Sequence, residues 1–189
     1  MKIGLYFGSF NPIHIGHLAI ANYFVEFSDM EQLWFVVSPQ NPFKEKKSLL
    51  AENHRLALVN VAIEDDLRFK ASNVEFSMPQ PSFTVDTLVY LKEKYPEHEF
   101  VLIMGEDNLK GFHKWKNYDQ ILNNHQIFIY PRDYKTINKV VYDNITVVDA
   151  PLIEVSSSFI RKAIKDGRDV KFFTQDKVAE YIKEMHFYE

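Results

Sequence analysis

Short apolar runs alternate with longer amphipathic segments along almost the whole chain. Four runs are nearly continuous in apolar residues, as expected for strands buried on both faces of a sheet: residues 2–7, 33–38, 100–104 and 127–130. Residues 67–71 and 145–149 are weaker candidates for the same role. Helical spacing of apolar residues predicts helices between these runs, at residues 15–27, 52–63, 85–94 and 118–123.

This alternation predicts an α/β fold, a Rossmann-like doubly wound parallel sheet with helices on both sides. After Ser156 the pattern changes to two helices, residues 157–166 and 175–185, with Gly167 ending the first. We interpret them as a C-terminal helical extension (residues 156–189) of a single domain whose α/β core spans residues 1–155. Residues 75–82 are predicted to form an ordered loop, and residues 41–50 a mobile basic loop. Ligands should bind beyond the carboxyl ends of the strands.

Composition narrows the class of protein. The chain is 46% apolar and 25% charged, with a net charge of -4, so no basic field favours a nucleic acid partner. The absence of cysteine excludes disulfides and thiolate metal sites and fits a reducing compartment. No run approaches the length of a membrane span, and the first residues do not have the pattern of a signal peptide. We therefore expect a cytoplasmic protein without membrane or nucleic acid partners. The sequence does not decide between a monomer and a homo-oligomer.

A histidine pair, His14 and His17, follows the first strand and begins the first predicted helix. A helix start offers free N–H groups and the positive end of the helix dipole to an anion. Imidazoles three residues apart share a helix face, and Gly16 between them allows close backbone approach. A metal site is the alternative, but the motif contains no third histidine or carboxylate. The pattern favours phosphate binding.

Two segments resemble signatures of one enzyme superfamily. Residues 8–17, Gly-Ser-Phe-Asn-Pro-Ile-His-Ile-Gly-His, resemble the His-x-Gly-His signature that a nucleotidyltransferase superfamily shares with class I aminoacyl-tRNA synthetases. Residues 155–161, Val-Ser-Ser-Ser-Phe-Ile-Arg, resemble the second signature of its small enzymes. Ser156 or Ser157 would serve as a helix cap in any protein. Beside the first motif, the serines and Arg161 are better interpreted as an anion site.

The middle of the chain makes the resemblance more specific. Residues 82–88, 104–109, 113–115 and 178–188 resemble the bacterial nicotinate-nucleotide adenylyltransferase family, in the family's order and over essentially the whole chain. The chain departs from the family at three positions. Phe7 precedes Gly8 where Gly-Gly is frequent, Asn11 stands where Asp is common, and Phe43 stands where a histidine often precedes Lys44. The change at Phe43 affects one expected phosphate contact.

The resemblance implies transfer of AMP from ATP to nicotinate mononucleotide, which yields nicotinate adenine dinucleotide and pyrophosphate. It assigns catalytic roles to His14, His17 and Arg161. ATP binding is assigned to Gly8, Ser9, Phe10, Gly16, Lys44, Gly105, Asp107, Ser157 and Ser158. Nicotinate mononucleotide binding is assigned to Ser82, Phe83, Thr84, Trp115 and Arg132. Mg²⁺ is expected on the substrate phosphates, with no protein metal ligand.

The residues assigned to the acceptor also have ordinary explanations. Thr84 is expected to cap the following helix, whose N–H groups would bind the nicotinate carboxylate. Trp115 could belong to the core, but its polar neighbours favour stacking on a pyridinium ring. Asp107 could only form a turn, yet it is placed to bind a ribose. Arg132 could pair with a phosphate of either nucleotide.

Other functions remain as alternatives. A related adenylyltransferase could act on phosphopantetheine or nicotinamide mononucleotide, although the Ser82–Thr84 turn and Trp115 favour a flat carboxylated ring. A synthetase-like or tRNA-binding module would need a longer chain and a basic face. A non-catalytic nucleotide sensor would not need His14, His17 and Arg161 intact. The acceptor would be an ionised phosphate, so the chemistry needs no general base, and the sequence shows no Ser-His-Asp or Cys-His arrangement.

Overall fold

The sheet has six parallel strands in the order β3-β2-β1-β4-β5-β6. The computed structural model describes residues 1–39, 49–132 and 143–189. Within them the strands are β1 (Lys2–Gly8), β2 (Gln32–Val37), β3 (Phe69–Ser72), β4 (Glu99–Gly105), β5 (Ile127–Tyr130) and β6 (Ile145–Val147). From β1 the chain adds β2 and β3 on one side and then returns to add β4, β5 and β6 on the other side of β1, so the strand order reverses between β1 and β4. In doubly wound sheets, this reversal opens a crevice at the carboxyl ends of the strands.

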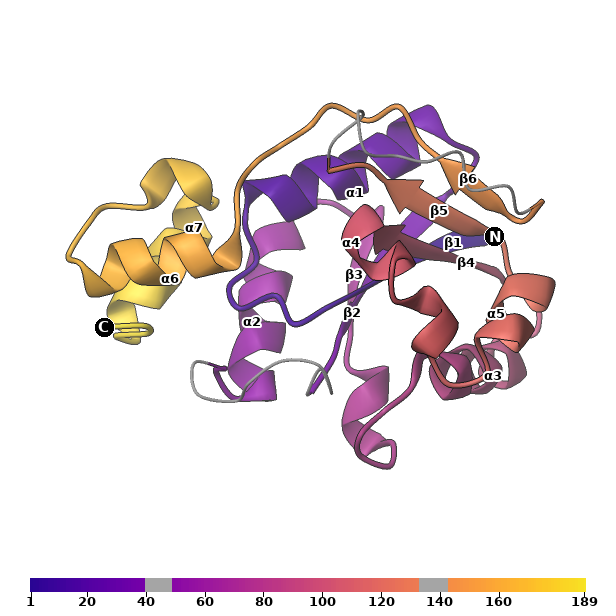
Figure 1. The fold of residues 1–189 in the computed structure, drawn as a ribbon. Coiled ribbons are helices and arrows are strands. Elements are labelled where there is room, and N and C mark those ends of the chain that lie inside the picture. The colour runs from indigo at the N-terminus through magenta and orange to yellow at the C-terminus, as the bar shows by residue number, and fades with distance from the viewer. Residues whose placement is uncertain (40–48, 133–142) are drawn as a thin grey trace.

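Helices cover both faces of the sheet and extend beyond it (Figure 1). The longer ones are α1 (Ile15–Phe27), α2 (Glu52–Ile63), α3 (Thr84–Lys94), α5 (Tyr118–Asn124), α6 (Ser157–Lys165) and α7 (Asp176–Glu184). Short turns of helix are η2 (Val74–Ser77), α4 (Glu106–Leu109), η3 (Phe112–Lys114) and η4 (Lys171–Phe173). The α6–α7 pair lies beside the sheet, with α7 against α2. No described helix is long and apolar enough to cross a membrane.

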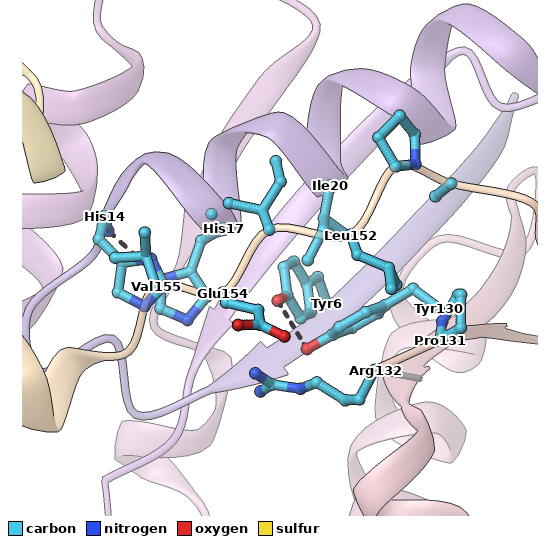
Figure 2. Close-up of a pocket in the computed structure, with 14 residues that line it drawn as sticks. Tyr6, His14, His17, Ile20, Tyr130, Pro131, Arg132, Leu152, Glu154 and Val155 are labelled. Atoms are coloured by element: carbon cyan, nitrogen blue, oxygen red, sulfur yellow. Dashed lines mark hydrogen bonds between the residues drawn. The ribbon is translucent and has the colours of Figure 1, made fainter. Parts of the chain in front are cut away.

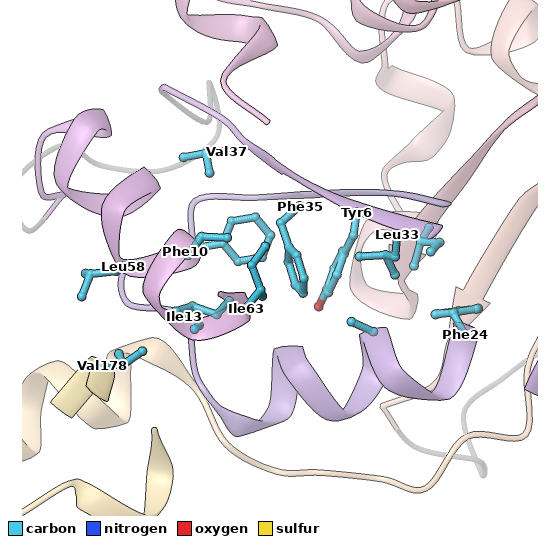
Figure 3. Packing of buried hydrophobic residues seen from close by; sticks show 14 of the residues in the cluster. Tyr6, Phe10, Ile13, Phe24, Leu33, Phe35, Val37, Leu58, Ile63 and Val178 are labelled. Carbon is cyan, nitrogen blue, oxygen red and sulfur yellow. The ribbon is translucent and has the colours of Figure 1, made fainter. Parts of the chain in front are cut away.

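Side chains that alternate along the strands divide the core into two layers. In β2, Leu33, Phe35 and Val37 join the layer beneath α1 and α2, whereas Trp34 and Val36 join the layer beneath α3 and α5. The first layer also contains Phe10 and Ile13, from the loop after β1, and Val178 from α7 (Figure 3). The loop that carries the first motif is therefore anchored in the core at two positions.

The structure confirms the predicted parallel sheet, with every predicted strand and helix within two residues of its expected bounds. The third strand begins at Phe69, later than expected, because the Arg68 N–H donates to Asp66 Oδ1 (3.0 Å) and holds a turn there. The expected loop at residues 75–82 begins within the helical turn η2. Of the predicted basic loop, only Leu49 and Leu50 lie within the described residues, so Lys44 and Phe43 lie outside them.

Candidate active site

Three adjoining hollows lie around the carboxyl end of β1, and the central one also borders the end of β4. The central cleft, about 420 Å³, contains most residues assigned to ATP or catalysis: Gly8, Ser9, Phe10, His17, Gly105, Asp107, Ser157, Ser158 and Arg161, together with Arg132. The side cleft, about 390 Å³, contains Ser82, Phe83 and Thr84. A small pocket of about 50 Å³ contains His14 and Gly16 (Figure 2). Trp115 lines both larger clefts, and His17 lines both the central cleft and the small pocket.

The two histidines stack at the start of α1. Their ring centroids are 3.7 Å apart and the planes meet at 23°. The His14 backbone N–H donates to His17 Nδ1 (3.3 Å), so this nitrogen carries no proton and Nε2 is the donor atom of the neutral ring. A Cβ at Gly16 would lie 3.1 Å from the His14 ring, so any larger residue there would require the ring to shift. The sequence predicted the shared face, and the backbone bond further orients His17 as a hydrogen-bond donor.

His14 is held neutral by its surroundings. Its side chain is buried, and burial lowers its pKa from 6.5 to about 4, with the Arg132 guanidinium acting in the same direction. Near pH 7 an uncharged imidazole therefore faces the small pocket. At that pH, His14 can offer a hydrogen bond to an anion but no full positive charge.

The pKa of His14 predicts a pH dependence of folding. An unfolded chain takes up this proton near pH 6.5 and the folded one only near pH 4, so the free energy of unfolding falls as the pH is lowered across that interval. The lowering of the pKa from 6.5 to about 4 corresponds to a loss of about 3 kcal/mol in the free energy of unfolding. Urea unfolding at several pH values should show this loss in the wild type and not in His14→Gln. Parallel pH curves for the two proteins would contradict the assignment.

The second motif contacts the loop of the first. The Ser157 hydroxyl donates to the Pro12 carbonyl (2.9 Å), and Arg161 donates to the Asn11 carbonyl (2.8 Å) and to Ser158 Oγ (3.2 Å). Ser156 caps α6 by accepting from the Phe159 N–H (3.2 Å). The start of α6 is thus held beside the start of α1, and both helices present N–H groups near one cleft.

Across the central cleft, Asp107 and Arg132 form an ion pair. Arg132 Nε lies 3.3 Å from Asp107 Oδ2, and the Arg132 backbone N–H donates to the buried carboxylate of Glu106 (3.0 Å). Glu106 and Asp107 begin α4 directly after β4, and Arg132 follows β5, so neighbouring strand ends bring them together. Asp107 lines the central cleft, and its carboxylate is paired there with Arg132.

The start of α3 differs from the prediction at Thr84. Phe83, not Thr84, is the N-cap of α3; Thr84 is the first helical residue and makes no capping bond. An extended Phe83, with φ -120° and ψ 140°, starts the helix one residue earlier than expected. Arg132, assigned to the acceptor, lines the central cleft and the small pocket but not the side cleft, because β5 ends beside β4. Trp115 is half-buried and packs edge-on against Phe112, 5.4 Å between ring centroids.

Three buried charged residues received no role in the sequence interpretation: Glu106, described above, Glu75 and Arg55. Glu75 lines the side cleft and accepts a hydrogen bond from the Thr87 hydroxyl (2.9 Å). Burial raises its pKa, against the opposing effect of the Thr87, Ser38 and Ser82 hydroxyls. Arg55 was detectable, since it occupies the first position of the buried face of α2, three and four residues before Leu58 and Val59.

Comparison with known proteins shows that this chain, with its doubly wound sheet, histidine pair and serine-arginine motif, is a nucleotidyltransferase. The cytidylyltransferase-like family model matches residues 5–163. The chain belongs, more narrowly, to the nicotinate-nucleotide adenylyltransferase family. It is 53% identical over 191 residues to the probable nicotinate-nucleotide adenylyltransferase of Flavobacterium johnsoniae, covering 100% of this chain and 99% of that protein. The probable enzyme of Bacteroides fragilis is 45% identical over 182 residues, covering 96% and 90%.

Solved structures show the same fold at low sequence identity. Plasmodium falciparum nicotinic acid mononucleotide adenylyltransferase complexed with NaAD superposes with a TM-score of 0.84 at 20% identity, covering 99% of this chain and 97% of that one. A putative nicotinate-nucleotide adenylyltransferase from Vibrio parahaemolyticus gives 0.74 at 20% identity, covering 99% and 94%. The α/β core and the C-terminal helices are thus common to these proteins.

Proposed function

We propose that this chain transfers AMP from ATP to nicotinate mononucleotide, forming nicotinate adenine dinucleotide and releasing pyrophosphate. The observation that carries the proposal is the wall shared by the two larger clefts, formed by Phe7, Gly8, Ser9, Asn108 and Trp115. A triphosphate in the central cleft and a mononucleotide in the side cleft would meet across this wall. The family's name and the NaAD bound to the Plasmodium falciparum enzyme support this choice of product.

ATP would occupy the central cleft with its phosphates toward the two helix starts. His17 donates from Nε2 to the α-phosphate, and Arg161 with the Ser157–Ser158 turn neutralises the β- and γ-phosphates. His14, in the adjoining small pocket, donates a second hydrogen bond to the ATP phosphates. Lys44 is assigned to the same phosphates from outside the described residues. Asp107 accepts from a ribose hydroxyl once its pair with Arg132 opens.

Mg²⁺ is proposed to enter with the triphosphate. The described ranges contain no group of three acidic or histidine side chains able to hold a metal ion, and the acceptor set that fits Mg²⁺ is the substrate's own phosphate oxygens and water. Bound in this way, the ion would withdraw charge from the leaving pyrophosphate. On the protein, Arg161 and the N–H groups of the two helix starts would also reduce the negative charge of the phosphates.

Nicotinate mononucleotide would occupy the side cleft. The Asp86 and Thr87 N–H groups are used within α3 by the Phe83 carbonyl, which leaves the preceding N–H groups of the helix start for a carboxylate. The Trp115 indole offers a face to the pyridinium ring. Glu75 also lines this cleft. Its carboxylate is hydrogen-bonded to the Thr87, Ser38 and Ser82 hydroxyls, which reduces its repulsion of the substrate carboxylate.

In the transfer step an oxygen of the acceptor's phosphate attacks the α-phosphorus in line with the leaving group. A new P–O bond forms as the bond to pyrophosphate breaks, and the electron pair goes to pyrophosphate. The attacking oxygen is ionised near neutral pH, so no residue has to remove a proton. The protein contributes alignment and charge neutralisation.

The location and partners of the enzyme are also proposals. Its partners would be the two nucleotides, with no nucleic acid, in keeping with the net charge of -4. We place it in the cytoplasm, which the absence of cysteine supports.

Trp115→Ala should raise the KM for nicotinate mononucleotide by about tenfold, which matches the 0.5–2 kcal/mol of a cation–π contact, and change the KM for ATP little. Trp115→Phe should retain part of the affinity because a smaller ring still stacks. Steady-state kinetics with each substrate varied in turn measures both constants. Equal weakening of both substrates would mean that Trp115 only supports the wall between the clefts.

Pyrophosphate release with a panel of acceptors tests the proposed substrate. The purified protein is incubated with ATP, Mg²⁺ and, in turn, nicotinate mononucleotide, nicotinamide mononucleotide and phosphopantetheine. The proposal expects rapid release with the first and much slower release with the others. Release with phosphopantetheine alone would overturn the substrate assignment, and release with none would favour a nucleotide sensor.

A further inference from the structure

The guanidinium of Arg55 lies buried behind the wall that the two larger clefts share. Arg55 is 0% exposed and is the largest fully buried side chain among the described residues. It extends from the buried face of α2 but lines none of the three hollows. A buried cation is costly unless its donors are satisfied. The hydrogen-bond acceptors of the guanidinium therefore explain why a cation can be buried at this position.

Four backbone carbonyls surround the guanidinium. Arg55 Nη1 donates to the carbonyls of Ser9 (2.7 Å) and Ser38 (2.8 Å). Nη2 donates to the carbonyl of Pro39 (2.8 Å) and Nε to that of Leu50 (2.9 Å). The planar fork thus joins the loop after β1, the loop after β2 and the segment that leads into α2.

These contacts fix the residues that separate the two substrates. Ser9 lines both larger clefts, and Ser38 lines the side cleft. The Ser38 N–H also donates to the Gly8 carbonyl (2.9 Å), and its hydroxyl stabilises the charge of Glu75 in the side cleft. Through Ser9 and Ser38, one side chain sets the position of the ATP loop relative to the acceptor cleft.

We propose that Arg55 is a positioning residue for AMP transfer, which holds the shared wall at Ser9 and Ser38 so that the acceptor phosphate meets the α-phosphate in line. This inference rests on the proposed function. A displacement of about 1 Å in such a geometry costs about 10²-fold in rate, whereas each substrate still binds its own cleft. Arg55 should therefore control turnover more than affinity.

The test compares Arg55→Lys and Arg55→Ala with the exposed Arg168→Ala as control. Lysine keeps the charge but cannot fork across four carbonyls. For Arg55→Lys we expect a kcat lower by about 10²-fold, with calorimetric Kd values for a non-hydrolysable ATP analogue and for nicotinate mononucleotide each within about fivefold of wild type. Added guanidinium ion, below unfolding concentrations, should restore part of the turnover of Arg55→Ala and leave that of the wild type unimproved.

The outcomes separate this inference from the proposed function. A wild-type protein that releases no pyrophosphate would refute the proposed function itself. With an active wild type, a folded Arg55→Lys with full turnover overturns the inference. Loss of both affinities in proportion to kcat, or unfolding of both variants, also overturns it, because Arg55 would then be a residue of the core only.

Discussion

Replacement of His17 by alanine is expected to lower kcat by about 10²–10³-fold, the usual cost of losing one preorganised donor to a developing charge. The reason lies in the bond from the His14 backbone to His17 Nδ1, which keeps Nε2 protonated and the ring oriented before ATP arrives. The charge on the transferring group grows in the transition state, so the lost bond affects turnover more than ground-state binding. The Kd for ATP should therefore rise by less than about tenfold.

Single-turnover kinetics and ATP-analogue titration measure these two quantities separately. The His17 ring also packs against Phe10 (5.1 Å between centroids), so thermal unfolding must show that the variant is folded. His186→Ala, at an exposed histidine, is the matched control and should behave as wild type. If ATP affinity and turnover fall by the same factor, His17 acts in binding alone.

Arg161→Ala should have the second large effect, on both ATP affinity and turnover. The guanidinium ties Ser158 to the Asn11 carbonyl and brings a full positive charge to the central cleft. Loss of a charged bidentate contact to phosphate and of the bond to Asn11 should lower kcat/KM by about 10²–10³-fold, or about 3–4 kcal/mol.

Arg161→Lys keeps the charge without the planar fork and should recover only part of the loss. The KM for nicotinate mononucleotide should change little in either variant, since Arg161 does not line the side cleft. The exposed Arg168, one turn beyond α6, supplies the control substitution to alanine. A rise in the KM for nicotinate mononucleotide equal to that for ATP would refute the assignment of Arg161 to the triphosphate.

The fold was predictable because its strands are buried on both faces. Residues 33–38 and 100–104 have the continuous apolar pattern expected of strands in a covered parallel sheet, and β2 and β4 formed there. Edge strands carry less of this signal, and so the start of β3 was misplaced. The turns η2 and η3 and the short helix α4 follow local hydrogen bonds that apolar periodicity does not report.

The site was predictable where its residues are adjacent in sequence, and less so where the fold brings distant segments together. The common face of His14 and His17 follows from their spacing, whereas the stacking of their rings and the bond from Arg161 to the Asn11 carbonyl were seen only in the structure. The ion pair of Arg132 with Asp107 depends on strand order, which the motifs do not encode. The capping role given to Thr84 failed because residue type alone does not define the first helical residue.

A crystal structure with Mg²⁺, a non-hydrolysable ATP analogue and nicotinate mononucleotide tests the central claim most directly. We expect the α-phosphate within hydrogen-bonding distance of His17 Nε2, the β- and γ-phosphates beside Arg161, and the pyridine ring against Trp115 with its carboxylate at the start of α3. A triphosphate bound away from the start of α1, with the two imidazoles free of phosphate, would contradict the account.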